Sequence, residues 1–102
     1  MTKKTFFDKH LDLSELEKHL SGDAELTVIV QRTMRNHVLS ALLELMPKDK
    51  HHVFLKDFSQ NPEDEKHWDV LREHIKDDVE KIVKTEVQRV KKEIIKELKW
   101  NF

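Results

Sequence analysis

Residues 62–102 contain no glycine and, after Pro62 itself, no proline. Apolar side chains recur along this stretch at helical spacing, beginning with Trp68, Leu71 and Ile75. One unbroken helix over these residues would be about 60 Å long, because a helix rises ~1.5 Å per residue. A compact chain of roughly 100 residues has a radius of gyration of only ~13 Å. The sequence therefore predicts a long C-terminal helix over residues 62–102 that extends beyond its own core.

The expected start of this helix carries several signals. Asn61 is a good N-cap residue, Pro62 suits the first helical position, and three acidic residues follow in the first turn. Further along, Trp68, Val79 and Val90 are spaced eleven residues apart. This spacing is typical of a straight or slightly right-handed apolar stripe.

Charge is unevenly distributed along the same stretch. Residues 63–80 carry eight acidic and three basic side chains, a net charge of −5. Residues 81–99 carry seven basic and three acidic side chains, a net charge of +4. Two interpretations remain open and are compatible. The charges complement the helix macrodipole, or they favour antiparallel pairing with a second copy of the chain.

The chain before Pro47 predicts two further helices. A short one is expected over residues 13–21, ending near Gly22, which is the only glycine. A longer one is expected to begin after Asp23 as the N-cap and to end before Pro47. The apolar stripe of this longer helix consists of Leu26, Val30, Met34, Val38, Leu42 and Leu45.

One segment conflicts with this assignment. Residues 27–30 form a β-branched run, which favours a strand, and a second short strand could follow around Val53 and Leu55. An α+β alternative with short strands near 26–30 and 52–55 therefore remains open. Otherwise residues 47–61 are expected to be a connection with an apolar plug packed on the helices. The plug consists of Val53, Phe54, Leu55 and Phe58.

These patterns predict an all-α fold, a single helical domain of three to four helices over residues 1–102. Charged residues make up 38% of the chain but the net charge is only −1, which argues against a protein that binds polyanions over its whole surface. The absence of cysteine excludes disulfides and thiolate chemistry. No signal-peptide pattern and no apolar run near ~18 residues occurs, so we expect a cytoplasmic protein that does not cross a membrane.

The histidines do not predict a metal site, although there are seven of them. No two are four residues apart, the spacing that a helical zinc site uses, and His67 and His74 are about 10.5 Å apart along a helix axis. The serines and threonines occur in no motif that would activate a nucleophile. We therefore expect no metal, no cofactor and no enzymatic activity.

The far end of the C-terminal stripe predicts a homodimer. The first two helices are expected to cover the stripe only as far as Ile82, so a second copy would cover the remainder. The residues expected to carry self-association are Val87, Val90, Ile94, Leu98, Trp100 and Phe102.

Two functions follow from these expectations. The first is a non-enzymatic interaction or regulatory protein that self-associates through its long C-terminal helix and binds a protein partner. The alternative is a small dimeric nucleic-acid-binding regulator, which would use a basic face over residues 81–99 or arginines in the second helix. The residues expected to contact nucleic acid are Arg32, Arg35, Lys84, Lys91, Lys92, Lys96 and Lys99.

Overall fold

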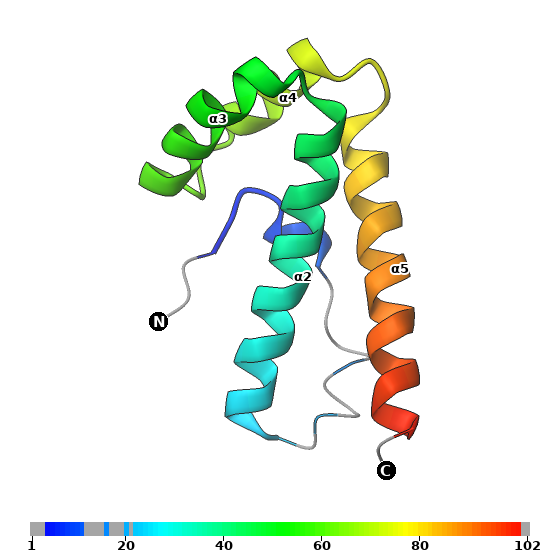
Figure 1. The fold of residues 1–102 in the computed structure, drawn as a ribbon. Coiled ribbons are helices and arrows are strands. Elements are labelled where there is room, and N and C mark those ends of the chain that lie inside the picture. Colours follow the sequence, from blue (N-terminus) through cyan, green and yellow to red (C-terminus); the bar gives the residue numbers. More distant parts are fainter. Residues whose placement is uncertain (1–3, 12–15, 17–19, 21, 101–102) are drawn as a thin grey trace.

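The computed structural model describes residues 4–11, 16, 20 and 22–100, with side chains up to residue 97. In this part of the chain all regular structure is helical (Figure 1). The elements are the 3-10 turn η1 (Asp8–His10) and the helices α2 (Ala24–Leu45), α3 (Lys48–Gln60), α4 (Lys66–His74) and α5 (Val79–Trp100). The predicted all-α fold is confirmed. The alternative with strands near 26–30 and 52–55 is wrong, because these residues lie within α2 and α3.

Helices α2 and α5 run side by side in opposite directions and form the main contact of the fold (Figure 1). The buried residues of α2 recur every fourth position, at Val30, Met34, Val38 and Leu42. Those of α5 are Val79, Val83, Val87 and Val90. Burying one such side chain contributes roughly 1.5–3 kcal/mol, so this contact supplies much of the stability. Among the described side chains, the predicted stripes are buried or partly buried except at Leu45, which is 46% exposed because α2 ends there and the next residue, Met46, takes the buried position.

The β-branched segment at residues 27–30 is helical because its start is capped and part of it is buried. The Asp23 carboxylate accepts a hydrogen bond from the Leu26 amide at 3.1 Å, as expected for the predicted N-cap. The Thr27 hydroxyl donates to the Asp23 carbonyl at 2.8 Å, and Val30 packs in the core. Burial and capping together outweigh the low helix propensity of these residues.

Residues 47–61 are not a connection, since most of them form helix α3. Pro47 precedes its first turn, and the Lys50 amide donates to the Pro47 carbonyl at 3.0 Å. Phe54 is buried and Phe58 is partly buried, whereas Val53 and Leu55 are exposed. The apolar plug is therefore confirmed only for the two phenylalanines, which are four residues apart and share one face of the helix.

The predicted helix over residues 62–102 is also corrected, because the structure divides it. Asn61 is the C-cap of α3, α4 begins at Lys66, and the chain leaves helical geometry at Ile75 with φ −117° and ψ 122°. A long C-terminal helix exists, but it is α5 and has 22 residues. Ile75 remains buried although it is outside the helix, and the Asp78 carboxylate accepts from the Lys81 amide at 3.2 Å to start α5. The turn thus keeps both apolar segments on one core without glycine or proline.

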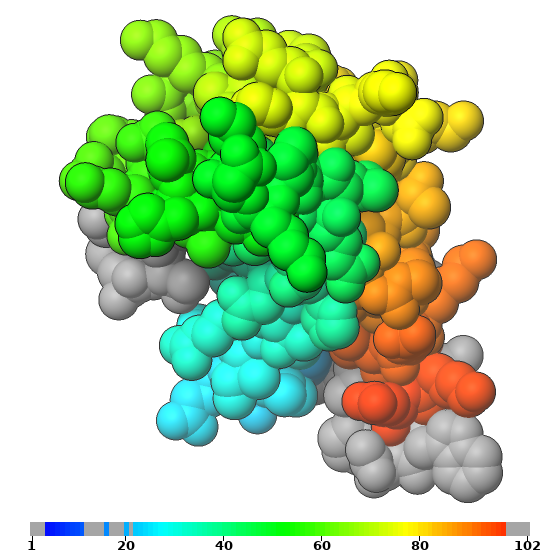
Figure 2. All heavy atoms as spheres, turned by 45° about the horizontal axis from the view of Figure 1, so that its top comes forward, coloured from blue at the N-terminus to red at the C-terminus, as the bar shows by residue number. Residues whose placement is uncertain are grey.

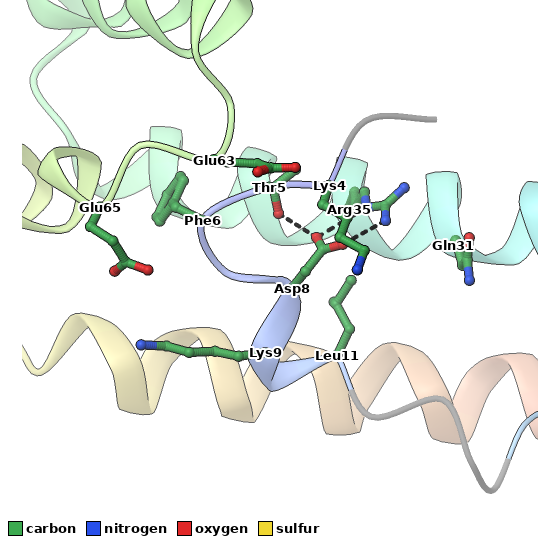
Figure 3. A pocket seen from close by; sticks show the side chains of 10 residues that line it. All are labelled: Lys4, Thr5, Phe6, Asp8, Lys9, Leu11, Gln31, Arg35, Glu63 and Glu65. Carbon is green, nitrogen blue, oxygen red and sulfur yellow. Dashed lines mark hydrogen bonds and ion pairs between the residues drawn. The ribbon is translucent and has the colours of Figure 1, made fainter. Parts of the chain in front are cut away.

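Residues 4–11, which we call the N-terminal strap, lie between α2 and α5 (Figures 1 and 3). Phe6, Phe7 and Leu11 of the strap are buried in the common core. Of the predicted helix over 13–21, only Leu16 and Leu20 are described, and both are helical and buried; the rest lies outside the described residues. Gly22 has a φ of +77°, and the following amide, of Asp23, donates to the Leu20 carbonyl at 3.0 Å. This geometry confirms Gly22 as the end of the helix.

Candidate interaction surface

Four lysines of α5 form an exposed face, which we call the lysine face. At ~100° per residue they fall within about 120° of the helix circumference, opposite the buried valines. In Figure 2 the side chains of α5 form one margin of the molecule, beside those of α2. The lysine face consists of Lys81, Lys84, Lys92 and Lys96, all exposed.

The charges of the lysine face are not neutralised locally. Among the ion pairs between described side chains, none involves these four lysines. Arg89, by contrast, donates to both Glu86 and Glu93, and its distance to Glu93 is 3.0 Å. The hydrogen bond to Glu86 raises the pKa of Arg89 above its ordinary value, so the guanidinium remains charged. Arg89 is therefore a paired cation at the edge of the lysine face.

A shallow depression of about 610 Å³ runs along the same side of α5. Its walls are side chains from successive turns of the helix. The lining residues are Lys84, Thr85, Gln88, Arg89, Lys92 and Glu93.

Two of the predicted nucleic-acid contacts are paired or buried in the structure. Arg35 is held by Asp8, with Nε–Oδ1 and Nη2–Oδ2 distances of 3.1 and 2.6 Å, and its side chain is only 12% exposed. Lys91 is 5% exposed although it lies on α5. Arg32 is exposed on α2, and the side chain of Lys99 lies outside the described residues. The remaining predicted contacts, Lys84, Lys92 and Lys96, belong to the lysine face.

Two residues expected to carry self-association are already covered within one chain. Val87 and Val90 are 1% and 2% exposed and belong to the core that α5 shares with α2 and with Leu11, Leu16 and Leu20. Ile94 is partly buried, and the side chains of Leu98, Trp100 and Phe102 lie outside the described residues. Self-association through these last four residues stays a prediction, whereas the buried valines offer no free surface.

A second depression, of about 910 Å³, lies where the strap crosses α2 (Figure 3). Its three basic and three acidic side chains balance, so its charge selects neither an anion nor a cation. Burial would raise the pKa of Asp8, but hydrogen bonds from Arg35 and Thr5 outweigh it and lower the pKa. The ion pair thus attaches the strap to α2. The lining residues are Lys4, Thr5, Phe6, Asp8, Lys9, Leu11, Gln31, Arg35, Glu63 and Glu65.

The buried histidine, His67, packs among aromatic rings and, within the described residues, not among metal-ligating side chains. His67 donates from Nε2 to the Asn61 carbonyl at 2.7 Å and is surrounded by the rings of Phe6, Phe54 and Phe58. No group of three or more metal-ligating side chains occurs among the described residues. Within the same part of the chain, no helix is both long enough and apolar enough to cross a bilayer.

Comparisons of the chain with protein families, with characterised proteins and with solved structures found no match. The arguments about function therefore rest on the geometry and charge of the surfaces described above.

Proposed function

We propose that this protein is a non-enzymatic interaction protein whose lysine face binds an acidic surface of a protein partner. The observation that carries the proposal is the set of four exposed lysines on one side of α5, unpaired among the described ion pairs. Unpaired charges of one sign attract a complementary surface from a distance and raise the rate of encounter. Regulation of that partner by covering its acidic surface is the role we propose.

The packing of α5 supports this role because it holds the lysine face rigid. The opposite side of the helix is fixed to α2 by Val83, Val87 and Val90, so the backbone does not need to become ordered when a partner binds. A rigid surface avoids part of the entropy cost of association. The long lysine side chains remain adaptable on this rigid base.

A protein partner is favoured over nucleic acid by the other charges. Arg35 is occupied by Asp8 and Arg89 by two glutamates, and arginine is the residue that binds bases and phosphates with a planar fork. Residues 63–80, which precede the lysine face, have a net charge of −5 and would repel a long phosphate backbone. A compact acidic surface can contact α5 alone. The cytoplasm as the compartment of this binding stays a prediction.

The test reverses charge on the lysine face and, as a matched control, on α3. The variant Lys84→Glu/Lys92→Glu changes two lysines of the face, and Lys48→Glu/Lys56→Glu makes the same change in net charge at two exposed positions of α3. Binding of labelled polyglutamate and of a short DNA duplex is measured by fluorescence anisotropy over a range of salt concentrations. Each protein is also used to capture partners from a lysate.

The proposal expects polyglutamate affinity to fall by about tenfold or more in the α5 variant and by less than about twofold in the α3 control. A captured protein should be retained by the parent and the control but lost with the α5 variant. Equal losses in both variants would mean that net charge alone drives binding. Tighter binding to the duplex, with a steep salt dependence, would replace the proposal with the nucleic-acid alternative.

A further inference from the structure

The N-terminal strap is held between α2 and α5 by contacts with several parts of the chain. The Phe6 amide donates to the Pro62 carbonyl at 2.7 Å, and the Phe6 ring lies 4.9 Å from the Trp68 ring of α4 in an edge-to-face arrangement. Asp8 pairs with Arg35 of α2. These contacts join a short terminal segment to helices that are distant in the sequence, and local opening of such a segment is a smaller event than unfolding of the whole chain.

His10 is the titratable side chain of the strap that is buried against α4 and α5. Its side chain is 12% exposed, its ring lies 5.7 Å from the Trp68 ring, and its Nε2 atom is 3.7 Å from a carboxylate oxygen of Glu80. That Nε2 atom is buried and has no hydrogen-bond partner. A neutral imidazole tolerates this environment better than an imidazolium, which needs two hydrogen-bond acceptors or water.

The charges around His10 do not compensate for the lost water. Burial lowers the pKa of His10, Glu80 opposes this effect, and Lys84 and Lys9 reinforce it. Glu80 is already shared, because Arg72 of α4 donates to its other oxygen at 3.1 Å. Its carboxylate is therefore partly neutralised before His10 gains a proton.

We propose that the N-terminal strap is an acid-sensitive element: protonation of His10 weakens its contact with α4 and α5 and releases residues 4–11 at mildly acidic pH. A docked histidine with a lowered pKa binds its proton more weakly than a free one, so docking is complete at higher pH. The docked state of the strap loses stability as the pH falls below about 6.5, which is the pKa of the free histidine side chain. The pair between Asp8 and Arg35 does not cause this release, because the pKa of Asp8 lies below 3.8.

Release would uncover an aromatic surface on α3 and α4. Phe6 covers Trp68, Phe58 and His67, with ring centroids 4.9 to 6.0 Å from its own. These rings would become accessible to solvent or to an apolar partner when the strap leaves. This inference does not rest on the proposed function, although Lys84 of the lysine face is one of the charges near His10.

The test follows the strap in the full-length chain with Trp100→Phe, which leaves Trp68 as its only tryptophan. Hydrogen exchange of the Phe6 amide, corrected for the intrinsic rate, reports how often its bond to Pro62 opens. Trp68 fluorescence reports uncovering of its ring. Both are recorded from about pH 7.5 to about pH 5.5, the interval in which histidine titrates, with far-UV circular dichroism to verify that the helices persist.

The proposal expects opening to increase severalfold over this interval, because the docked histidine binds its proton more weakly than the released one. His10→Gln should remove this increase, and His52→Gln, at an exposed position of α3, should retain it. Glu80→Gln should make it steeper, because Glu80 favours the protonated form, and this variant serves if His10→Gln does not fold. No increase in the parent, or the same increase in His10→Gln, would overturn the proposal.

Discussion

Asp8 and Arg35 are 27 residues apart, and their ion pair shows how much a single contact contributes to the arrangement of this small protein. Both side chains are mostly buried, and two hydrogen bonds join them. A charged group that loses its partner in such a place retains the cost of its desolvation. The sequence does not reveal this pair, because both would be ordinary charged surface residues if α2 and the strap did not meet.

At this scale we predict that Arg35→Met lowers the free energy of unfolding by about 1.5–3 kcal/mol at neutral pH, measured by urea denaturation. Arg89→Met is the control, because the Arg89 guanidinium is open to solvent and its ion pairs should contribute much less to stability. Since the pKa of Asp8 is lowered when the chain is folded, this contribution is present above pH 3.8 and declines as the pH falls further. Equal losses in the two variants would contradict the prediction.

The turn between α4 and α5 decides the shape at the scale of elements. Ile75 and Val79 have the spacing of a continuing helix, and no glycine or proline separates them, so local pattern could not reveal the break. An unbroken helix of about 60 Å would also exceed the longest dimension of the molecule, which is 43 Å. The break is favoured because both segments then pack on the same core, a gain that arises only from contacts with α2 and the strap.

We predict that Asp78→Ala destabilises the protein by about 1 kcal/mol, because it removes the side-chain acceptor for the first turn of α5. Asp78→Asn should retain most of the stability, since asparagine is also a good N-cap. Asp77→Ala, at the adjacent exposed residue, should change the melting temperature little. Thermal unfolding of the three variants checks this order, and a loss in Asp77→Ala as large as in Asp78→Ala would contradict it.

At the scale of the whole molecule, the pairing of α2 with α5 determines which surfaces remain for partners. The apolar side of α5 is buried as far as Val90, and its charged side is exposed to solvent. Binding of an acidic protein therefore becomes the leading proposal, and self-association depends on Ile94 and the residues after it.

Accordingly, Val87→Ala should cost roughly 2 kcal/mol, the sum of lost burial and an unfilled cavity. The loss should be the same over a wide range of protein concentration, because this side chain is already buried within a single chain. If a second copy covered Val87, stability would rise with concentration through mass action. Calorimetry at several concentrations, with sedimentation to record the oligomeric state, separates these outcomes.

The sequence by itself determined the helical class, the buried stripes of α2 and α5, the N-cap at Asp23 and the turn at Gly22. These features depend on the periodicity of apolar residues and on the chemistry of neighbouring backbone groups, which a linear pattern records. Only the tertiary structure decided that residues 48–60 form helix α3, that α4 ends at His74 and that Val87 and Val90 are buried within one chain. It also decided that Arg35 is paired with Asp8 and that Lys91 is buried. Each of these outcomes depends on contacts between residues far apart in the chain, and local periodicity carries no information about which of two helical faces will meet.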